Sequence, residues 1–215
     1  MSSGNTDTDT DTGTGTDTGT ERGTDRGPEV GNGFAVVAEV MRRRRTSMLV
    51  DRNRPVAKAL VRELCELAQW APNHKRTWPW RFALVEGHGR IRLGDAIADS
   101  MELRGDPAEK VTKTRGKYLR TPATLVVGSA IGDTTNRTSE NRDSVAAGVQ
   151  NLLIGATALG LATYWGSCPD GAHGPVGELC GFEADTHISA LIYLGWATTE
   201  VEAPVRPPVR LTFVE

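Results

Sequence analysis

The segment that decides the fold is residues 71–80, which read APNHKRTWPW. A helical pattern leads into Ala71 and must end there, because the residue before a proline is disfavoured in the helical conformation. Polar residues 73–77 then form a donor-rich loop, and Arg81–Val85 has the pattern of a strand. Such a loop, closed by Trp78 and Trp80, is suited to an anionic aromatic ligand. Two core indoles beside a solvated connection would give the same pattern.

Helical patterns flank this loop on both sides. Val56–Ala68 carries apolar residues on one face and follows Pro55, a residue suited to the first turn of a helix. Trp70, at the end of that face, is expected in the core. Upstream, the apolar spacing of Phe34–Met41 predicts a further helix, which ends in the run Arg42–Arg45.

The second half of the chain adds one long helix and most of the strands. Val145–Leu159 is the most regular helical pattern, and its small residues, Gly148 and Gly155 among them, fit either an ordinary central helix or a helix–helix dimer contact. Buried strands are predicted at Ala123–Gly128, Thr163–Gly166 and His187–Gly195. The proline-rich end after Trp196 predicts an extended arm. These elements indicate an α+β fold with helices around a central mixed sheet.

Length and composition favour one domain with an N-terminal tail. The chain has 215 residues, and residues 1–33 repeat Thr, Asp and Gly with almost no apolar residues. Such a segment buries too little surface to offset its ordering entropy, so we expect 1–33 to be disordered and 34–215 to form the domain. The formal net charge of the chain is −2. Because the tail is acidic, the domain is only mildly basic, which suits an anionic ligand and does not require nucleic acid.

The cysteines and histidines indicate a reducing compartment and no metal site. Cys65, Cys168 and Cys180 are odd in number and widely spaced, which argues against a disulfide framework. The four histidines show no metal-ligand spacing with them. No apolar run reaches the ~20 residues of a membrane span, and the acidic N-terminus is not a secretory signal. We therefore expect a cytoplasmic protein with no membrane partner.

The order of motifs resembles a known family. Arg-Arg-Thr at 44–46, a helix begun by proline, the Ala-Pro loop and Pro-Trp-Arg-Phe at 79–82 resemble the opening of the nitroreductase family of FMN-dependent oxidoreductases. The stretch ALGLATYWGS, residues 158–167, is similar to that family's strand beneath the flavin ring. The resemblance extends from Met41 to the C-terminus and is strongest to smaller members with a histidine in the Ala-Pro loop. It implies a homodimer with two FMN sites at the interface.

The resemblance also implies particular cofactor contacts. The matched positions are Arg44, Arg45 and Thr46 for the phosphate, His74 for a flavin contact from the other subunit, Tyr164, Trp165 and Gly166 for the backbone beside the isoalloxazine, and Arg206 or alternatively Arg210 for a late phosphate contact. Arg76 and Trp78 depart from the Asn and Gln of many members, which leaves substrate choice open. No side chain is implied as a catalytic residue.

The implied activity is reduction of a small electron-poor acceptor, such as a nitroaromatic or a quinone, by NAD(P)H through FMN. Because both substrates would use one face of the flavin, the resemblance implies ping-pong hydride transfer. An alternative is a flavin carrier, sensor or flavin-consuming relative that does not turn over NAD(P)H. A nucleic-acid-binding module built on Arg42–Arg45 is a third hypothesis, which the mild charge of the domain disfavours.

Overall fold

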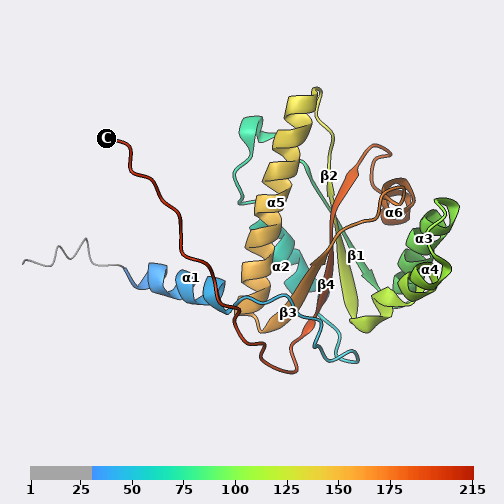
Figure 1. The fold of residues 1–215 in the computed structure, drawn as a ribbon, viewed down its shortest axis with the longest axis horizontal. Coiled ribbons are helices and arrows are strands. Elements are labelled where there is room, and N and C mark those ends of the chain that lie inside the picture. The colour runs from blue at the N-terminus through green and yellow to red at the C-terminus, as the bar shows by residue number, and fades with distance from the viewer. Residues whose placement is uncertain (1–30) are drawn as a thin grey trace, which may run out of the picture.

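The structure is a computed structural model that describes residues 31–215 (Figure 1). One antiparallel sheet has the strand order β1-β2-β4-β3, so β4 lies inside the sheet although it is the last strand in the chain. The strands are β1 Trp80–Glu86, β2 Ala123–Ser129, β3 Leu161–Gly166 and β4 His187–Trp196. The predicted α+β class is confirmed. The predicted mixed sheet is wrong, since parallel pairing within residues 31–215 is limited to an isolated bridge between Thr46 and Thr163.

The helices lie on both faces of the sheet. Their bounds are α1 Asn32–Arg43, α2 Lys58–Ala68, α3 Gly89–Leu103, α4 Ala108–Arg115, α5 Thr135–Ala158 and α6 His173–Cys180, with single turns at His74–Arg76 and Lys117–Arg120. Figure 1 shows α2 and α5 on one face and α3, α4 and α6 on the other. The expected tail, 1–33, lies outside the described residues except for its last three, where α1 begins.

Helix α5 is longer than its apolar spacing predicts. It begins at Thr135, ten residues before Val145, because its first half is a polar helix. The hydroxyl of Thr134 caps it by accepting a hydrogen bond of 3.1 Å from the backbone N–H of Arg137. The polar half therefore extends beyond the core and places charged side chains beside the loop that follows α2.

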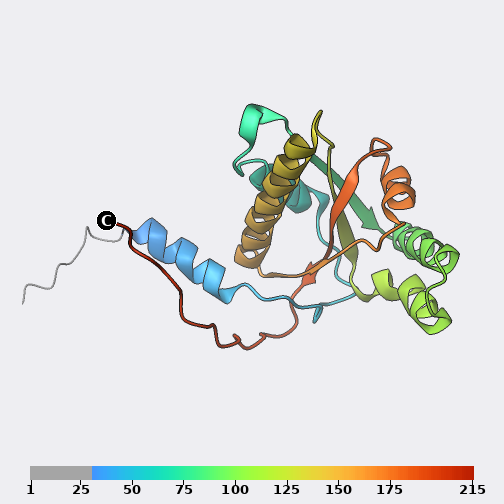
Figure 2. The same ribbon diagram turned by 45° about the horizontal axis from the view of Figure 1, so that its top comes forward.

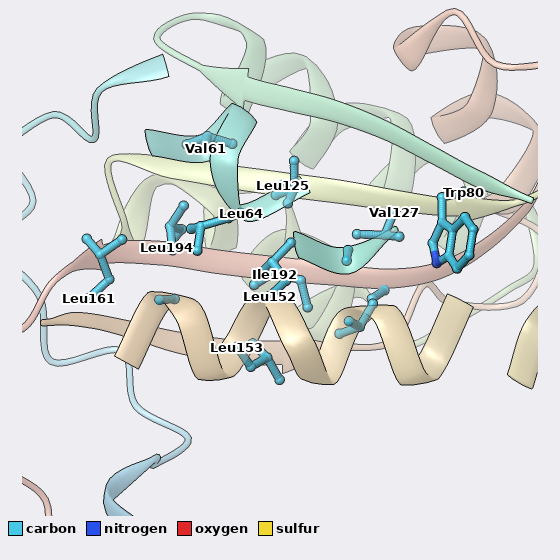
Figure 3. Close-up of a cluster of buried hydrophobic side chains, with 14 of the residues drawn as sticks. Val61, Leu64, Trp80, Leu125, Val127, Leu152, Leu153, Leu161, Ile192 and Leu194 are labelled. Atoms are coloured by element: carbon cyan, nitrogen blue, oxygen red, sulfur yellow. The ribbon is translucent and has the colours of Figure 1, made fainter. Parts of the chain in front are cut away.

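The core between the sheet and helices α2 and α5 is closely packed (Figure 3). Leu64, Leu152 and Ile192 meet there and are fully buried. A Cβ atom built on Gly148 would lie 2.5 Å from Nε1 of Trp80 and 2.6 Å from the carbonyl oxygen of Ala68. This glycine thus lets α5 approach α2 and β1 within one chain, which supports the ordinary-helix interpretation at this position rather than a dimer contact.

The opposite core contains stacked aromatic rings. Tyr118 lies parallel to Tyr193 with ring centroids 5.4 Å apart, and both side chains are buried. Trp70, by contrast, was expected in the core and is 84% exposed. It lies two residues beyond the end of α2 at Ala68, where the chain has left the helix and helical spacing no longer sets the direction of the side chain.

Helix α1 and the chain after β4 leave the body at the same end of the molecule (Figures 1 and 2). Residues 197–215 contain no helix and no further strand, which confirms the predicted extended arm. Both segments expose large apolar side chains, including Phe34, Met41, Val209 and Phe213. Within residues 31–215, no helix combines the length and the apolar character needed to cross a membrane.

Candidate functional site

A cavity of about 530 Å³ lies at the beginning of β3. Its walls are Arg43, Arg45 and Ser47, the residues 157–162 at the end of α5 and the start of β3, and Ala197 and residues 199–201 after β4. Two guanidinium groups and a hydroxyl on one wall are suited to a phosphate, since an arginine fork can donate two parallel hydrogen bonds to its oxygens.

Arg45 connects the segments of the chain that form this wall. Its Nε donates to the carbonyl oxygen of Val201 at 3.1 Å. Another of its guanidinium nitrogens donates to the carbonyls of Arg42 and Arg44 at 2.6 and 2.8 Å. The side chain therefore fixes the basic segment against the chain that follows β4 and commits part of its own donors in doing so.

The basic segment runs along the edge of β3. Thr46 forms the isolated bridge with Thr163, and the N–H of Ser47 donates to the carbonyl of Thr163 at 2.9 Å. Arg43, Arg45 and Ser47 line the cavity, whereas Arg44 and Thr46 are not among its walls. From Arg44 onward the alternation follows from extended backbone, in which successive side chains point to opposite sides. Applied to residues 44–47, it would have identified Ser47 beside Arg45, whereas Arg43 reaches the cavity as the last residue of α1.

Strand β3 presents a free edge at Trp165. Tyr164 faces the other core, with its ring edge-on to Tyr193 at 5.6 Å. Trp165 is on the α5 side, is 37% exposed, and donates from its indole to the carbonyl of Ser189 at 3.3 Å. Backbone groups alternate in direction along a strand, and the carbonyl of Thr163 points outward to Ser47. The N–H and C=O of Trp165 therefore point to the same outer edge, and Gly166, which is buried, ends the strand.

A second cavity, of about 290 Å³, lies beside Trp165 between α5 and the ends of β3 and β4. Its other walls are Ser139, Arg142, Asp143, Ala146, His187 and Ser189. Burial, with the positive charge of Arg142 and the nearby His173, lowers the pKa of His187, so its imidazole is neutral at pH 7. The first cavity reaches Ala162 and the second begins at Trp165, a separation along β3 of about 10 Å.

The loop after α2 has a strained backbone. Lys75, Arg76 and Trp78 have positive φ values of 62°, 53° and 50°. Each such residue costs roughly 1–2 kcal/mol relative to an ordinary conformation, and residues strained in this way gather at binding sites. Trp78 is 58% exposed while Trp80 is buried. Only one of the two indoles expected to close the loop is thus available to a ligand.

Helix α5 holds this loop in place. The side-chain amide of Asn73 donates to the hydroxyl of Ser144 at 3.2 Å, and the hydroxyl of Thr77 donates to Asn141 at 2.6 Å. The amide oxygen of Asn73 also accepts the N–H of Trp78 at 2.9 Å. These bonds fix the backbone on either side of His74, whose exposed ring lies beside Glu140.

The predicted site residues do not all meet within one chain. His74 lies at the Glu140 end of α5, whereas the first cavity lies at Thr157. At the rise of an α-helix these two places are about 25 Å apart. Arg206 and Arg210 belong to the exposed segment 197–215 and are not among the walls of either cavity.

Comparison with known proteins shows which family of proteins this chain is similar to. Residues 41–196 match the sequence profile of the nitroreductase family. "Putative NAD(P)H nitroreductase YfhC" of Bacillus subtilis is 27% identical over 184 residues, which are 84% of this chain and 94% of that protein. A nitroreductase-like family protein from Bacillus cereus superimposes with a TM-score of 0.69 and 30% identity, over 80% of this chain and 91% of that one.

The fold also matches a more distant structure. The FMN-dependent nitroreductase NfnB from Mycobacterium smegmatis, solved in complex with NADPH, has a TM-score of 0.66 and 18% identity, over 83% of this chain and 99% of that chain. At this level of identity the match concerns the fold alone.

Proposed function

The chain belongs to the nitroreductase family, and from this premise we propose that it is an FMN-dependent oxidoreductase that uses NAD(P)H to reduce small electron-poor acceptors, nitroaromatics and quinones among them. FMN, when bound, supplies the ring that accepts and returns a hydride. The observation that carries the proposal is the row of features along β3: a basic cavity at its start, a free backbone edge at Trp165, and a second cavity beside that residue.

The residues present fit FMN. A phosphate suits the wall formed by Arg43, Arg45 and Ser47, and about 530 Å³ is within the usual size of ligand cavities. An aromatic ring suits the half-exposed indole and the outward N–H of Trp165, about 10 Å further along the strand. Arg44 and Thr46, which the resemblance assigns to the phosphate, stay in the proposal as members of the same short segment.

The substrates have a place beside the ring. The cavity at Trp165 holds hydroxyls of Ser139 and Ser189, the neutral imidazole of His187 and the guanidinium of Arg142. These groups can hydrogen-bond a carboxamide, a nitro group or a quinone oxygen. NAD(P)H and the acceptor would occupy it in turn, which gives ping-pong kinetics.

The site is completed by a second copy of the chain. Because the Glu140 and Thr157 ends of α5 are about 25 Å apart, His74 and the phosphate wall of one chain lie near opposite ends of this helix. Two copies with antiparallel α5 helices would place the His74 end of one against the phosphate wall of the other. The midpoint between Glu140 and Thr157 lies at Gly148 and Val149, which are buried, and the adjacent Ala147 is an exposed small residue on this helix. It would allow two α5 helices to pack closely across a two-fold axis.

The two projecting segments support the same assembly. The exposed apolar side chains of α1 and of residues 197–215 form surfaces that isolated proteins rarely leave in water. We propose that they pack on the partner, where Arg206 or Arg210 reaches its phosphate. The three cysteines are free thiols, which supports a cytoplasmic location.

A spectroscopic experiment tests the function. The purified protein should be yellow, should lose its flavin absorbance under nitrogen when NADPH or NADH is added, and should regain it when a nitroaromatic or quinone follows. A yellow protein that neither nicotinamide bleaches would support the carrier or sensor. A protein that binds no flavin would overturn the proposal.

A further inference from the structure

His74 belongs to a charged cluster on the polar half of α5. Its Nδ1 lies 3.0 Å from Oε1 of Glu140, and a guanidinium nitrogen of Arg137 lies 2.9 Å from Oε2 of the same carboxylate. The amide of Asn136 donates to Oε1 at 3.1 Å. Glu140 thus has a partner on each oxygen and connects the loop to the helix.

These contacts decide which nitrogen of His74 carries a proton. A carboxylate can only accept, so a separation of 3.0 Å from Nδ1 favours a proton on that nitrogen. The same guanidinium nitrogen of Arg137 is 3.4 Å from Nδ1. It cannot donate to a protonated Nδ1, and it lies closer to Oε2 of Glu140, at 2.9 Å, as an ion pair. Hydrogen bonding from His74, aided by the charge of Arg137, lowers the pKa of Glu140, so the carboxylate stays ionised.

Glu140 acts on the ring and not on the loop backbone. The backbone around His74 is held by other side chains of α5, since Asn141 binds Thr77 and Ser144 binds Asn73. Loss of the Glu140 carboxylate leaves both of these bonds in place. The imidazole would then be free to rotate, while the strained conformation of residues 75–78 would persist.

We propose that Glu140, supported by Arg137, is a positioning residue that fixes His74 in its Nδ1–H tautomer and so presents Nε2 as the atom that meets the flavin of the partner subunit. This inference rests on the proposed function and adds two residues to it. Nε2 is the nitrogen of this ring without a contact in residues 31–215. With Nδ1–H committed to Glu140, a neutral ring offers Nε2 as an acceptor.

The tautomer can be measured without the cofactor. The chain has four histidines, so nitrogen-15 labelling and two-bond correlation spectra resolve every imidazole, and His74→Gln identifies the signal of interest. His74 should be the Nδ1–H form in the wild type and should lose that preference in Glu140→Ala. Glu140→Gln keeps an oxygen that accepts from Nδ1–H and should retain it. A wild-type ring in the Nε2–H form would overturn the inference.

Flavin titration tests the second part of the inference, that Nε2 of His74 meets the flavin of the partner subunit. Glu140→Ala should bind FMN about three- to tenfold more weakly, Glu140→Gln should stay near the wild type, and the exposed Glu63→Gln on α2 is the matched control. FMN affinity that is equal in the wild type, Glu140→Ala and His74→Gln would overturn the inference and leave the proposed function intact. A protein that takes up no FMN would overturn the proposed function, and the flavin half of the inference with it.

Discussion

The indole nitrogen of Trp80 lies against Gly148 of α5, so close that a β-carbon on the glycine would come within 2.5 Å of it. The same β-carbon would lie 2.6 Å from the carbonyl oxygen of Ala68 on α2. One glycine therefore sets how closely α5 approaches both α2 and β1.

Gly148→Ala should destabilise the fold for this reason. Alanine gains about 0.5–1 kcal/mol of helix propensity, but overpacking against backbone costs about 1–3 kcal/mol, so a net loss is expected. For a chain of this size each 1 kcal/mol lowers the melting temperature by about 2–4 °C, which thermal unfolding can resolve. Gly155→Ala is the control, because its β-carbon would meet only flexible methyl groups of Leu64 and Leu67 at 2.9 Å. Equal melting temperatures for the two variants would contradict this account of Gly148.

Arg43→Ala should weaken FMN binding and leave riboflavin binding unchanged, because riboflavin lacks the phosphate. Loss of a charge-assisted hydrogen bond costs ~1.5–3 kcal/mol, or roughly one to two decades in affinity. Fluorescence titration with both flavins measures the difference. Arg44→Ala, on the other side of the extended segment, is the comparison. If Arg44→Ala weakened FMN binding more than Arg43→Ala did, the cavity wall formed by Arg43, Arg45 and Ser47 would not be the phosphate site.

Ala147→Glu should separate the subunits. The residue is exposed in one chain and lies near the midpoint of the proposed two-fold contact, where two carboxylates would face each other. The monomer should keep its helix content by circular dichroism, while sizing chromatography should show the dimer and the flavin absorbance falling together. Ala184→Glu, at another exposed position, should change neither. A monomeric Ala147→Glu that kept its full complement of FMN would refute the shared site.

The ion pair between Arg81 and Glu183, at 2.8 Å, should make stability depend on acidic pH. Hydrogen bonds from Arg81 lower the pKa of Glu183 from 4.5 to about 2. The unfolded chain therefore binds more protons than the folded one between these values, so the stabilisation is present above pH 4.5 and is lost as pH falls towards 2. Melting temperatures of the wild type and Glu183→Gln should differ at pH 7 and converge over that range. A constant difference would assign the effect to something other than this carboxylate.

The sequence allowed the strands and the class of fold to be predicted because their apolar and β-branched residues are contiguous. It concealed the first half of α5, whose stability comes from capping and contacts with the loop rather than from an apolar face. Trp70 was wrongly predicted to lie in the core. The spacing of apolar residues would continue the helix to Trp70, but α2 ends before it. Gly148 could not be assigned to an intrachain contact, since spacing does not say which helix approaches.

The candidate site was predicted in part. The motifs identify the segment 44–46, the loop around His74 and the strand at Trp165, and the structure gives each of them a position. Arg43 and Ser47 were missed. Alternation along the extended chain from Arg44 was sufficient to find Ser47, whereas Arg43 lines the cavity from the end of α1. Glu140 could not be predicted from the sequence, because only the folded structure brings a carboxylate from the middle of the sequence to the ring of His74.

The position of β4 in the sheet has a consequence for synthesis. This strand pairs with both β2 and β3, yet it is the last of the four strands to be made. Until Trp196 has left the ribosome, β2 can pair with only one strand, and the sheet is too incomplete for the helices to cover its apolar faces. The sheet must therefore close late, after β4 has been made, through contacts distant in sequence that form slowly. In this interval the unpaired edges of β2 and β3 are exposed, and such edges can pair with other chains and aggregate.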